Sequence, residues 1–285
     1  MQIIATATIP ASNACSHLGV SKSTYYWWKN KSASSEDDAQ ILPQIQDIAG
    51  EFPKYGYRRI THELRRREEL VNHKRVLRIM KENNLLVRRK KAKPITTQSN
   101  HGLQKYPNLA KDLVLTGLNQ VWVADITYIW LVKEFVYLAV ILDLFSRKCV
   151  GWALSRHPDS QLTLDALNRA ITTRRNVVGC IHHSDQGVQY AAHAYVQRLR
   201  EAGMKPSMGE VGNSYENAHA ESYIKTIKYE EVYMNEYETI EDVYCNIKQF
   251  IEEVYNKNRL HSGIGYKPPE EFEQEVLNKR GVLCA

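Results

Sequence analysis

Three apolar segments in succession, each rich in β-branched and aromatic residues, most constrain how this 285-residue chain can fold. They cover residues 121–128, 135–144 and 148–154, and short polar breaks separate them. Such a pattern predicts consecutive antiparallel strands. Alternating patterns follow: a helix from about Ser160, a strand over 177–182, a helix over 191–202 and a short strand over 205–208. The order predicts an α/β domain.

Three acidic residues stand in dissimilar surroundings within this region. Asp125 ends the apolar run VWVA, Asp185 lies in the motif HHSDQG, and Glu221 lies in the motif ENAHAES. Carboxylates from separate elements suit Mg²⁺ or Mn²⁺, because hard cations prefer oxygen ligands and leave coordination positions open for phosphate oxygens. We therefore expect Asp125, Asp185 and Glu221 to be catalytic residues that hold two divalent ions for phosphoryl transfer on DNA.

The spacing of these acids carries a family resemblance. Fifty-nine residues lie between Asp125 and Asp185, and thirty-five between Asp185 and Glu221. This resembles the DDE core of integrase-like transposases. Four further motifs extend the resemblance over about residues 41–272: YGYRR at 55–59, WVADITY at 122–128, HSDQG at 183–187 and YNKNRLHS at 255–262. Together they resemble the second-reading-frame transposases of bacterial insertion sequences, family three.

The resemblance implies a ribonuclease-H-like integrase catalytic core, with a mixed five-stranded sheet and flanking helices. In that fold the first strand brings Asp125 to the sheet centre, the fourth delivers Asp185 beside it, and a later helix supplies Glu221. The implied activity is metal-dependent DNA strand cleavage and strand transfer at insertion-sequence ends. Water nicks the element end, and the freed 3′-OH then attacks a second phosphodiester. The resemblance also implies a homo-oligomer on DNA and a companion first-reading-frame protein.

Charge is unevenly distributed along the chain. Residues 1–107 contain 19 Lys and Arg against nine Asp and Glu, a net charge of +10, whereas the remaining residues contain 19 and 23, a net charge of −4. A basic amino-terminal module joined to a domain with acidic site residues fits a protein that binds DNA phosphates with one part and cleaves DNA with the other. A solvated helical surface would give the same charge.

Apolar residues at helical spacing predict three short helices over 36–87, a small all-α domain that resembles a helix-turn-helix. Asn72 is the expected N-cap of the third helix. The outer face of that helix should contact DNA through Lys74, Arg75, Arg78 and Lys81. A merely solvated face is the alternative.

We expect the flanking parts to be less regular. Residues 1–35 predict an amino-terminal helical segment, with a polar connector at 32–38. A basic linker over 88–107 should track the DNA backbone through Arg88, Arg89, Lys90 and Lys91, although a disordered tether has the same composition. The catalytic core should then span 108–272, followed by a tail over 273–285.

The helix that carries Glu221 has a second basic position of interest. Lys228 resembles the basic residue that the family places seven positions after the glutamate, and we expect it to bind DNA. Lys225 is undecided between DNA contact and an ordinary i,i+4 pair with Glu221. The histidines at 182 and 183 are expected to support Asp185, and Asp143 to shape a strand end. The 255–262 motif either contacts DNA or braces the active-site helix.

Composition excludes several classes. Five scattered cysteines without a C-x-x-C pair indicate neither a disulfide framework nor a zinc finger. No apolar stretch approaches the ~20 residues that a membrane span needs, and the start lacks a secretory signal, so we expect a cytoplasmic, nucleoid-associated protein. A ribonuclease H, a junction nuclease, an inactive DNA-binding regulator and a structural protein remain as alternatives to a transposase.

Overall fold

The computed structural model describes residues 15–16, 19, 21–87, 103–209 and 217–283, without the side chains of 26–37 and 280–283. The chain divides into two compact units, Met1–Lys90 and Lys91–Ala285. Each is described by itself. Within the described residues, no helix combines the length and the hydropathy that crossing a membrane requires.

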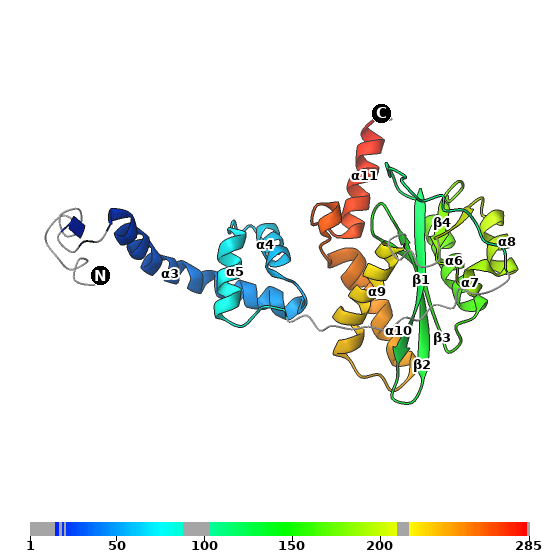
Figure 1. Ribbon diagram of the computed structural model, residues 1–285, viewed down its shortest axis with the longest axis horizontal. Helices are drawn as coiled ribbons and strands as arrows, with labels where there is room; N and C mark the ends of the chain where they lie inside the picture. Colours follow the sequence, from blue (N-terminus) through cyan, green and yellow to red (C-terminus); the bar gives the residue numbers. More distant parts are fainter. Residues whose placement is uncertain (1–14, 17–18, 20, 88–102, 210–216, 284–285) are drawn as a thin grey trace. The chain divides into compact units, whose positions relative to one another are not determined.

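The first unit is built from three mutually contacting helices (Figure 1): α3 (Lys22–Glu51), α4 (Tyr57–Arg66) and α5 (His73–Glu82). Asn72 caps α5 as expected, because its side-chain oxygen accepts a hydrogen bond from the Lys74 amide at 2.9 Å. Each helix buries an apolar stripe at helical spacing, including Ile45, Leu64 and Ile79. The three predicted helices are present, but the first is not short: α3 has 30 residues and begins at Lys22, so the expected boundary at 35/36 falls inside it.

The polar connector expected at 32–38 is wrong, because helix α3 runs through these residues without interruption. This stretch contains serines and acidic residues but no glycine or proline, so nothing in it forces the backbone out of a helix. At its end, Asp38 forms ion pairs with Arg75 and Arg78 of α5, at 2.7 and 2.6 Å. These long-range contacts tie this part of α3 to the rest of the unit.

The second unit contains the predicted mixed sheet. Its strands are β1 (Val121–Trp130), β2 (Phe135–Asp143), β3 (Cys149–Ser155), β4 (Ile181–Ser184) and β5 (Lys205–Met208). They lie in the order β3-β2-β1-β4-β5. The first three pair antiparallel, whereas β4 runs parallel to β1 and β5 parallel to β4. β4 begins four residues later than expected, because Gly179 adopts a positive φ of 82° in the turn before it.

Helices cover both faces of this sheet (Figure 1). On one face lie α6 (Ser160–Arg174), α7 (Val188–Ala191) and α8 (His193–Glu201), and on the other lie α9 (Ala218–Glu230), α10 (Ile240–Gln249) and the π-helix η2 (Phe250–Asn258). Alternate residues of β1 supply the two cores: Trp122 and Ala124 pack toward α6, and Val121 and Val123 toward α9. An α/β fold of the integrase-core type results.

Helix α6 lies very close to strand β3 at Gly151. A β-carbon added there would stand 2.3 Å from the backbone oxygen of Ala166 and 2.7 Å from Cβ of Ala170. Only glycine permits this approach of helix to strand.

The carboxy-terminal helix α11 spans Pro269–Leu283, so the expected boundary between core and tail at 272/273 falls inside it. Glu273 is buried and accepts hydrogen bonds from the Ser146 hydroxyl at 2.6 Å and from Nη1 of Arg174 at 2.9 Å. The start of the presumed tail is therefore part of the core.

Candidate active site

Asp125 lies on the central strand where that strand loses a neighbour. β4 pairs with β1 only at Val121–Val123, and in the described part of the chain no strand pairs with β1 beyond that point on this side. We call this place, where β1 continues past the end of β4, the notch. The Asp125 carboxylate lies there. Its Oδ1 accepts a hydrogen bond from the Ile126 amide at 2.8 Å.

Asp185 follows the last residue of β4 and reaches the same notch. Its Oδ1 accepts a hydrogen bond from the Gly187 amide at 3.0 Å, which fixes the carboxylate in a tight turn. A β-carbon at position 187 would stand 2.9 Å from this oxygen, so the turn needs glycine for space rather than for its φ of −68°.

Glu221 lies in the first turn of α9, and the start of this helix is tied to β1. The side-chain amide of Asn217, the N-cap residue, donates a hydrogen bond to the carbonyl oxygen of Ala124 at 3.1 Å. Because Ala124 precedes Asp125, this bond holds the amino-terminal end of α9 beside the notch. The Glu221 side chain is 38% exposed, and its Oε2 lies 3.4 Å from Nζ of Lys225.

The electrostatics of Asp125 report its neighbours. The pKa of Asp125 is raised from 3.8 to about 7: burial is the largest cause, the charges of Asp185 and Glu221 add to the rise, and the hydrogen bond from the Ile126 amide and the charge of Lys228 oppose it. All three carboxylates thus act on one region. Among the residues described, however, no three His, Cys, Asp or Glu side chains are placed to hold one metal ion together.

The tight cluster expected from the sequence is therefore not formed in this structure. The Glu221 carboxylate instead faces Lys225 of the same helix. The donor chemistry nevertheless fits a hard divalent cation, since the notch offers carboxylate oxygens. The buried Oδ1 of Asn217 adds another oxygen, and it accepts no hydrogen bond from any described residue.

Lys228 lies on α9 within electrostatic reach of the notch. Its Nζ lies 4.1 Å from the centroid of the Tyr128 ring, a cation–π contact. Burial lowers the pKa of Lys228, and the charge of Asp125 raises it in part. Lys228 is thus a half-buried cation within electrostatic reach of Asp125, where a phosphate would need one.

The basic residues predicted on α5 fall into two groups. Lys74 and Lys81 are exposed. Arg75 and Arg78 instead form the ion pairs with Asp38, and Arg78 also pairs with Glu82 at 3.1 Å. These two arginines therefore hold α5 to α3. Arg88, Arg89, Lys90 and Lys91 lie outside the described residues.

The histidines before Asp185 each have a hydrogen-bonding partner. The Tyr195 hydroxyl lies 2.9 Å from Nε2 of His182, and the Ser207 hydroxyl lies 2.9 Å from Nδ1 of His183. Both histidines are buried, and burial lowers the pKa of His182 from 6.5 to about 3. These contacts hold the two imidazole rings against α8 and β5, and the expected support of Asp185 stays a prediction.

Asp143 shapes the turn after β2, as expected. Its oxygens accept hydrogen bonds from the backbone amides of Asn119, Phe145 and Ser146, at 2.7, 2.9 and 3.1 Å. This buried carboxylate is fully used in the turn and does not join the notch.

Residues of the 255–262 motif contact α9 and β3, as expected if the motif braces the helix that carries Glu221, which is one of the two roles that the sequence left open. The Arg259 guanidinium donates two hydrogen bonds, at 2.6 and 2.7 Å, to the Glu230 carboxylate at the end of α9. The Asn256 side chain accepts from the amide of Cys149 at 3.0 Å and donates to its carbonyl at 3.1 Å, as a paired strand would. Both side chains are buried.

Asn217 is the residue that sequence reasoning missed. The only signal was its place in the ENAHAES motif, four residues before Glu221, because its partner Ala124 is 93 residues away.

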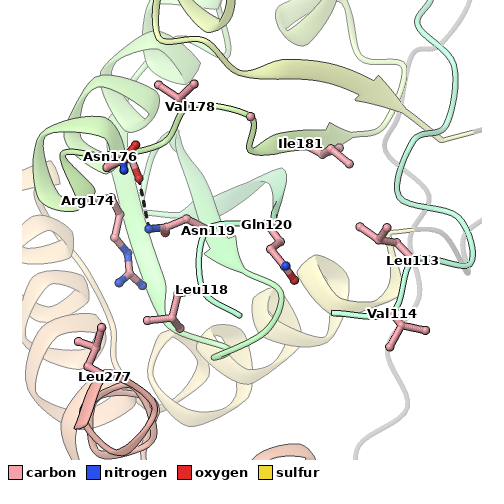
Figure 2. A pocket seen from close by; sticks show the side chains of 11 residues that line it. Leu113, Val114, Leu118, Asn119, Gln120, Arg174, Asn176, Val178, Ile181 and Leu277 are labelled. Atoms are coloured by element: carbon pink, nitrogen blue, oxygen red, sulfur yellow. Dashed lines mark hydrogen bonds between the residues drawn. The ribbon is translucent and has the colours of Figure 1, made fainter. Parts of the chain in front are cut away.

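A cavity of about 560 Å³ lies elsewhere in the second unit (Figure 2). It is lined at the start of the parallel strands by Gln120 and Ile181, and by Leu113, Val114 and Leu277, among others. Asp185 follows the opposite end of β4, so this cavity is not the notch of the carboxylates.

Comparison with known proteins agrees with this architecture. Residues 116–214 and 202–269 each match an integrase core domain, and residues 35–93 match an HTH-like domain. The chain is 35% identical over 266 residues to the insertion element IS600 uncharacterized 31 kDa protein of Shigella sonnei, covering 92% of this chain and 97% of that one. It is 34% identical over 270 residues to the transposase for insertion sequence element IS629 of Shigella sonnei, covering 91% and 90%.

A third relative names the family. The chain is 31% identical over 270 residues to transposase InsF for insertion sequence IS3A of Escherichia coli strain K12, covering 92% of this chain and 93% of that one. These alignments run through both the helical unit and the integrase core. The chain therefore belongs to the IS3 family of bacterial insertion-sequence transposases, which are polynucleotidyl transferases that act on DNA.

Proposed function

We propose that Asp125, Asp185 and Glu221 form the metal-binding catalytic triad for cleavage and strand transfer at insertion-sequence ends. The observation that carries the proposal is the position of Asp125 on β1 beside the end of β4, which Asp185 directly follows; the charges of both Asp185 and Glu221 act on Asp125 there. Three neighbouring carboxylates repel one another when they are ionised, and a divalent cation would supply the positive charge that offsets this repulsion.

The proposal assigns a task to each side chain. Asp125 and Asp185 offer oxygens from the two adjacent parallel strands, and Glu221 is exposed enough to approach them from α9. These side chains would hold Mg²⁺ or Mn²⁺, two ions by the family resemblance, which would supply positive charge to the attacking and leaving oxygens of an in-line displacement. Lys228 orients a phosphate beside Asp125. The Asn217–Ala124 bond keeps α9 in register with β1.

The test compares Asp125→Asn with Asp165→Asn, an exposed aspartate of α6 in the same unit. With Mg²⁺, a duplex bearing an element end and a target plasmid, the Asp165 variant should join strands like the wild type, whereas the Asp125 variant should join none. Both should bind the duplex equally by fluorescence anisotropy. Normal joining by Asp125→Asn refutes the triad, and degradation of the duplex by the wild type without joined products indicates a nuclease instead.

For the first unit we propose DNA binding through the exposed Lys74 and Lys81 of α5, with a basic linker over 88–107 leading to the catalytic core. Arg75 and Arg78 stabilise this face through their ion pairs with Asp38, and Lys74 and Lys81 are the residues proposed to make the main DNA contacts. Exchanging Lys74 and Lys81 for glutamine should weaken duplex binding and reduce the dependence of log affinity on log salt by about two units. Equal salt slopes for the variant and the wild type would remove this assignment.

The active assembly that we propose is a homo-oligomer on paired element ends, and a first-reading-frame product is its companion. Sedimentation of the protein with and without end-containing DNA tests the oligomer. A single protomer bound per DNA end, with no larger species, would exclude it.

A further inference from the structure

A cluster of aromatic side chains lies beside the notch and has no part in the chemistry proposed above. It comprises Tyr128 and Trp130 at the end of β1, Phe135 at the start of β2, and Tyr229 and Tyr233 in and after α9. The Phe135 ring lies 4.4 Å from the Trp130 ring and 5.3 Å from the Tyr128 ring, between centroids. Tyr229 and Tyr233 make an edge contact at 5.4 Å.

The two parts of this cluster adjoin each other. Burial raises the pKa of Tyr233, and the neighbouring phenols of Tyr229 and Tyr128 raise it further, so Tyr233 lies within electrostatic reach of Tyr128. Lys228 places its Nζ 4.1 Å from the Tyr128 ring centroid. We call these five rings together with Lys228 the aromatic surface. Through Lys228, this surface borders the notch.

Much of the aromatic surface faces solvent. Trp130 is 54% exposed, Phe135 45% and Tyr233 58%. Single exposed apolar residues are ordinary, but large rings that contact one another at the surface mark a binding site. Aromatic rings beside a cation match unpaired nucleobases, because every base has a face that stacks on a ring while its phosphate meets the positive charge.

We propose that the aromatic surface stacks unpaired bases of the DNA strand whose phosphate lies in the notch. This inference rests on the proposed function, since it assumes that the notch takes a DNA phosphate. Cleavage at the element end, the step before strand transfer, frees a strand end next to the scissile phosphate. Stacking its bases on Trp130 and Phe135 would hold that end open and fix its direction toward Asp125.

The test uses the full chain in EDTA, so that no cleavage occurs. The probe is a duplex with a short single-stranded 3′ tail that contains 2-aminopurine, whose fluorescence falls when it stacks on an aromatic ring; a fully paired duplex with the same base is the comparison. The wild type should quench the tailed probe. Trp130→Leu keeps an apolar side chain but removes the ring, and it should bind the tailed probe at least about fivefold more weakly.

Matched variants separate stacking from other effects. Trp130→Phe should restore most of the quenching, Phe135→Leu should repeat the loss, and Tyr244→Leu, at an exposed tyrosine of α10, should change nothing. Binding to the fully paired duplex should stay the same in all of them. Far-UV circular dichroism checks that each variant is folded.

Two results would overturn the inference. Equal quenching by the wild type and Trp130→Leu shows that no base stacks there. A change in sedimentation of Trp130→Leu without a change in tailed-probe binding shows that the surface joins two copies of the chain. Failure of the triad is distinguishable, because Asp125→Asn should still quench the tailed probe in EDTA even though it joins no strands.

Discussion

The side chain of Asn217 donates a hydrogen bond to the carbonyl oxygen of Ala124, and this single bond ties the start of α9 to the residue before Asp125. Asn217 is 8% exposed, so little water can replace the bond. One carboxylate of the proposed triad lies on each of the two elements that it joins. The alignment of Glu221 with Asp125 therefore depends on a residue that itself has no charge.

Replacing Asn217 with alanine should leave the Ala124 carbonyl without its partner and cost about 1–3 kcal/mol of unfolding free energy. Strand joining should fall further than this loss explains, because α9 is no longer held in register. Urea denaturation and a joining assay measure the two effects. Asn235→Ala is the control: its amide donates to the Glu231 carbonyl at an exposed site, and the change should stay within about 0.5 kcal/mol. Equal joining by both variants contradicts the positioning role.

A methyl group at position 187 should displace Asp185 without unfolding the protein. Its β-carbon would stand 2.9 Å from Oδ1 of Asp185, while the φ of −68° suits any residue. Joining by Gly187→Ala should fall by roughly 10²-fold, since small displacements of reacting groups have effects of that size. Gly263→Ala is the control, because its nearest neighbour would be Nε of Arg147 at 3.9 Å. Undiminished joining by Gly187→Ala would show that the turn does not fix Asp185.

The first three strands could be predicted from local signals, because runs of β-branched and aromatic residues mark β1, β2 and β3. The family resemblance, which rests partly on the spacing of Asp125, Asp185 and Glu221, implied that the first strand lies at the sheet centre with the fourth beside it, and the sheet confirms this. The start of β4 was placed too early, because the apolar residues Val177 and Val178 belong to the turn stabilised by Gly179. Composition alone cannot distinguish an apolar turn from a strand end.

The missed features depend on contacts between distant residues. The uninterrupted α3 places Asp38 where it pairs with Arg75 and Arg78, about forty positions later. These ion pairs engage two arginines that the sequence analysis had assigned to DNA contact. The pairing of Asn256 with Cys149 spans 107 positions.

Arg259 and Glu230 form a buried bidentate ion pair that should be strongly asymmetric to mutation. Their side chains are 4% and 15% exposed, so removal of one partner takes away a bidentate ion pair that water can only partly replace. Arg259→Met should therefore cost about 3–5 kcal/mol of unfolding free energy. The double variant Arg259→Met/Glu230→Leu should recover most of that loss in the same urea titration. If the double variant is no more stable than the single one, the bracing arises from packing and not from the ion pair.

His182 should make the protein less stable in acid. Burial lowers the pKa of this imidazole from 6.5 to about 3, so the folded protein keeps it neutral where the unfolded chain already binds a proton. Its contribution is complete above pH 6.5 and is lost progressively as the pH falls toward 3. The unfolding free energy of His182→Gln, whose amide can still meet the Tyr195 hydroxyl, should decline less steeply over this range. His219, with a pKa lowered by burial to about 4, acts in the same direction in both proteins and cancels in the comparison. Parallel declines for the variant and the wild type would mean that His182 does not titrate on unfolding.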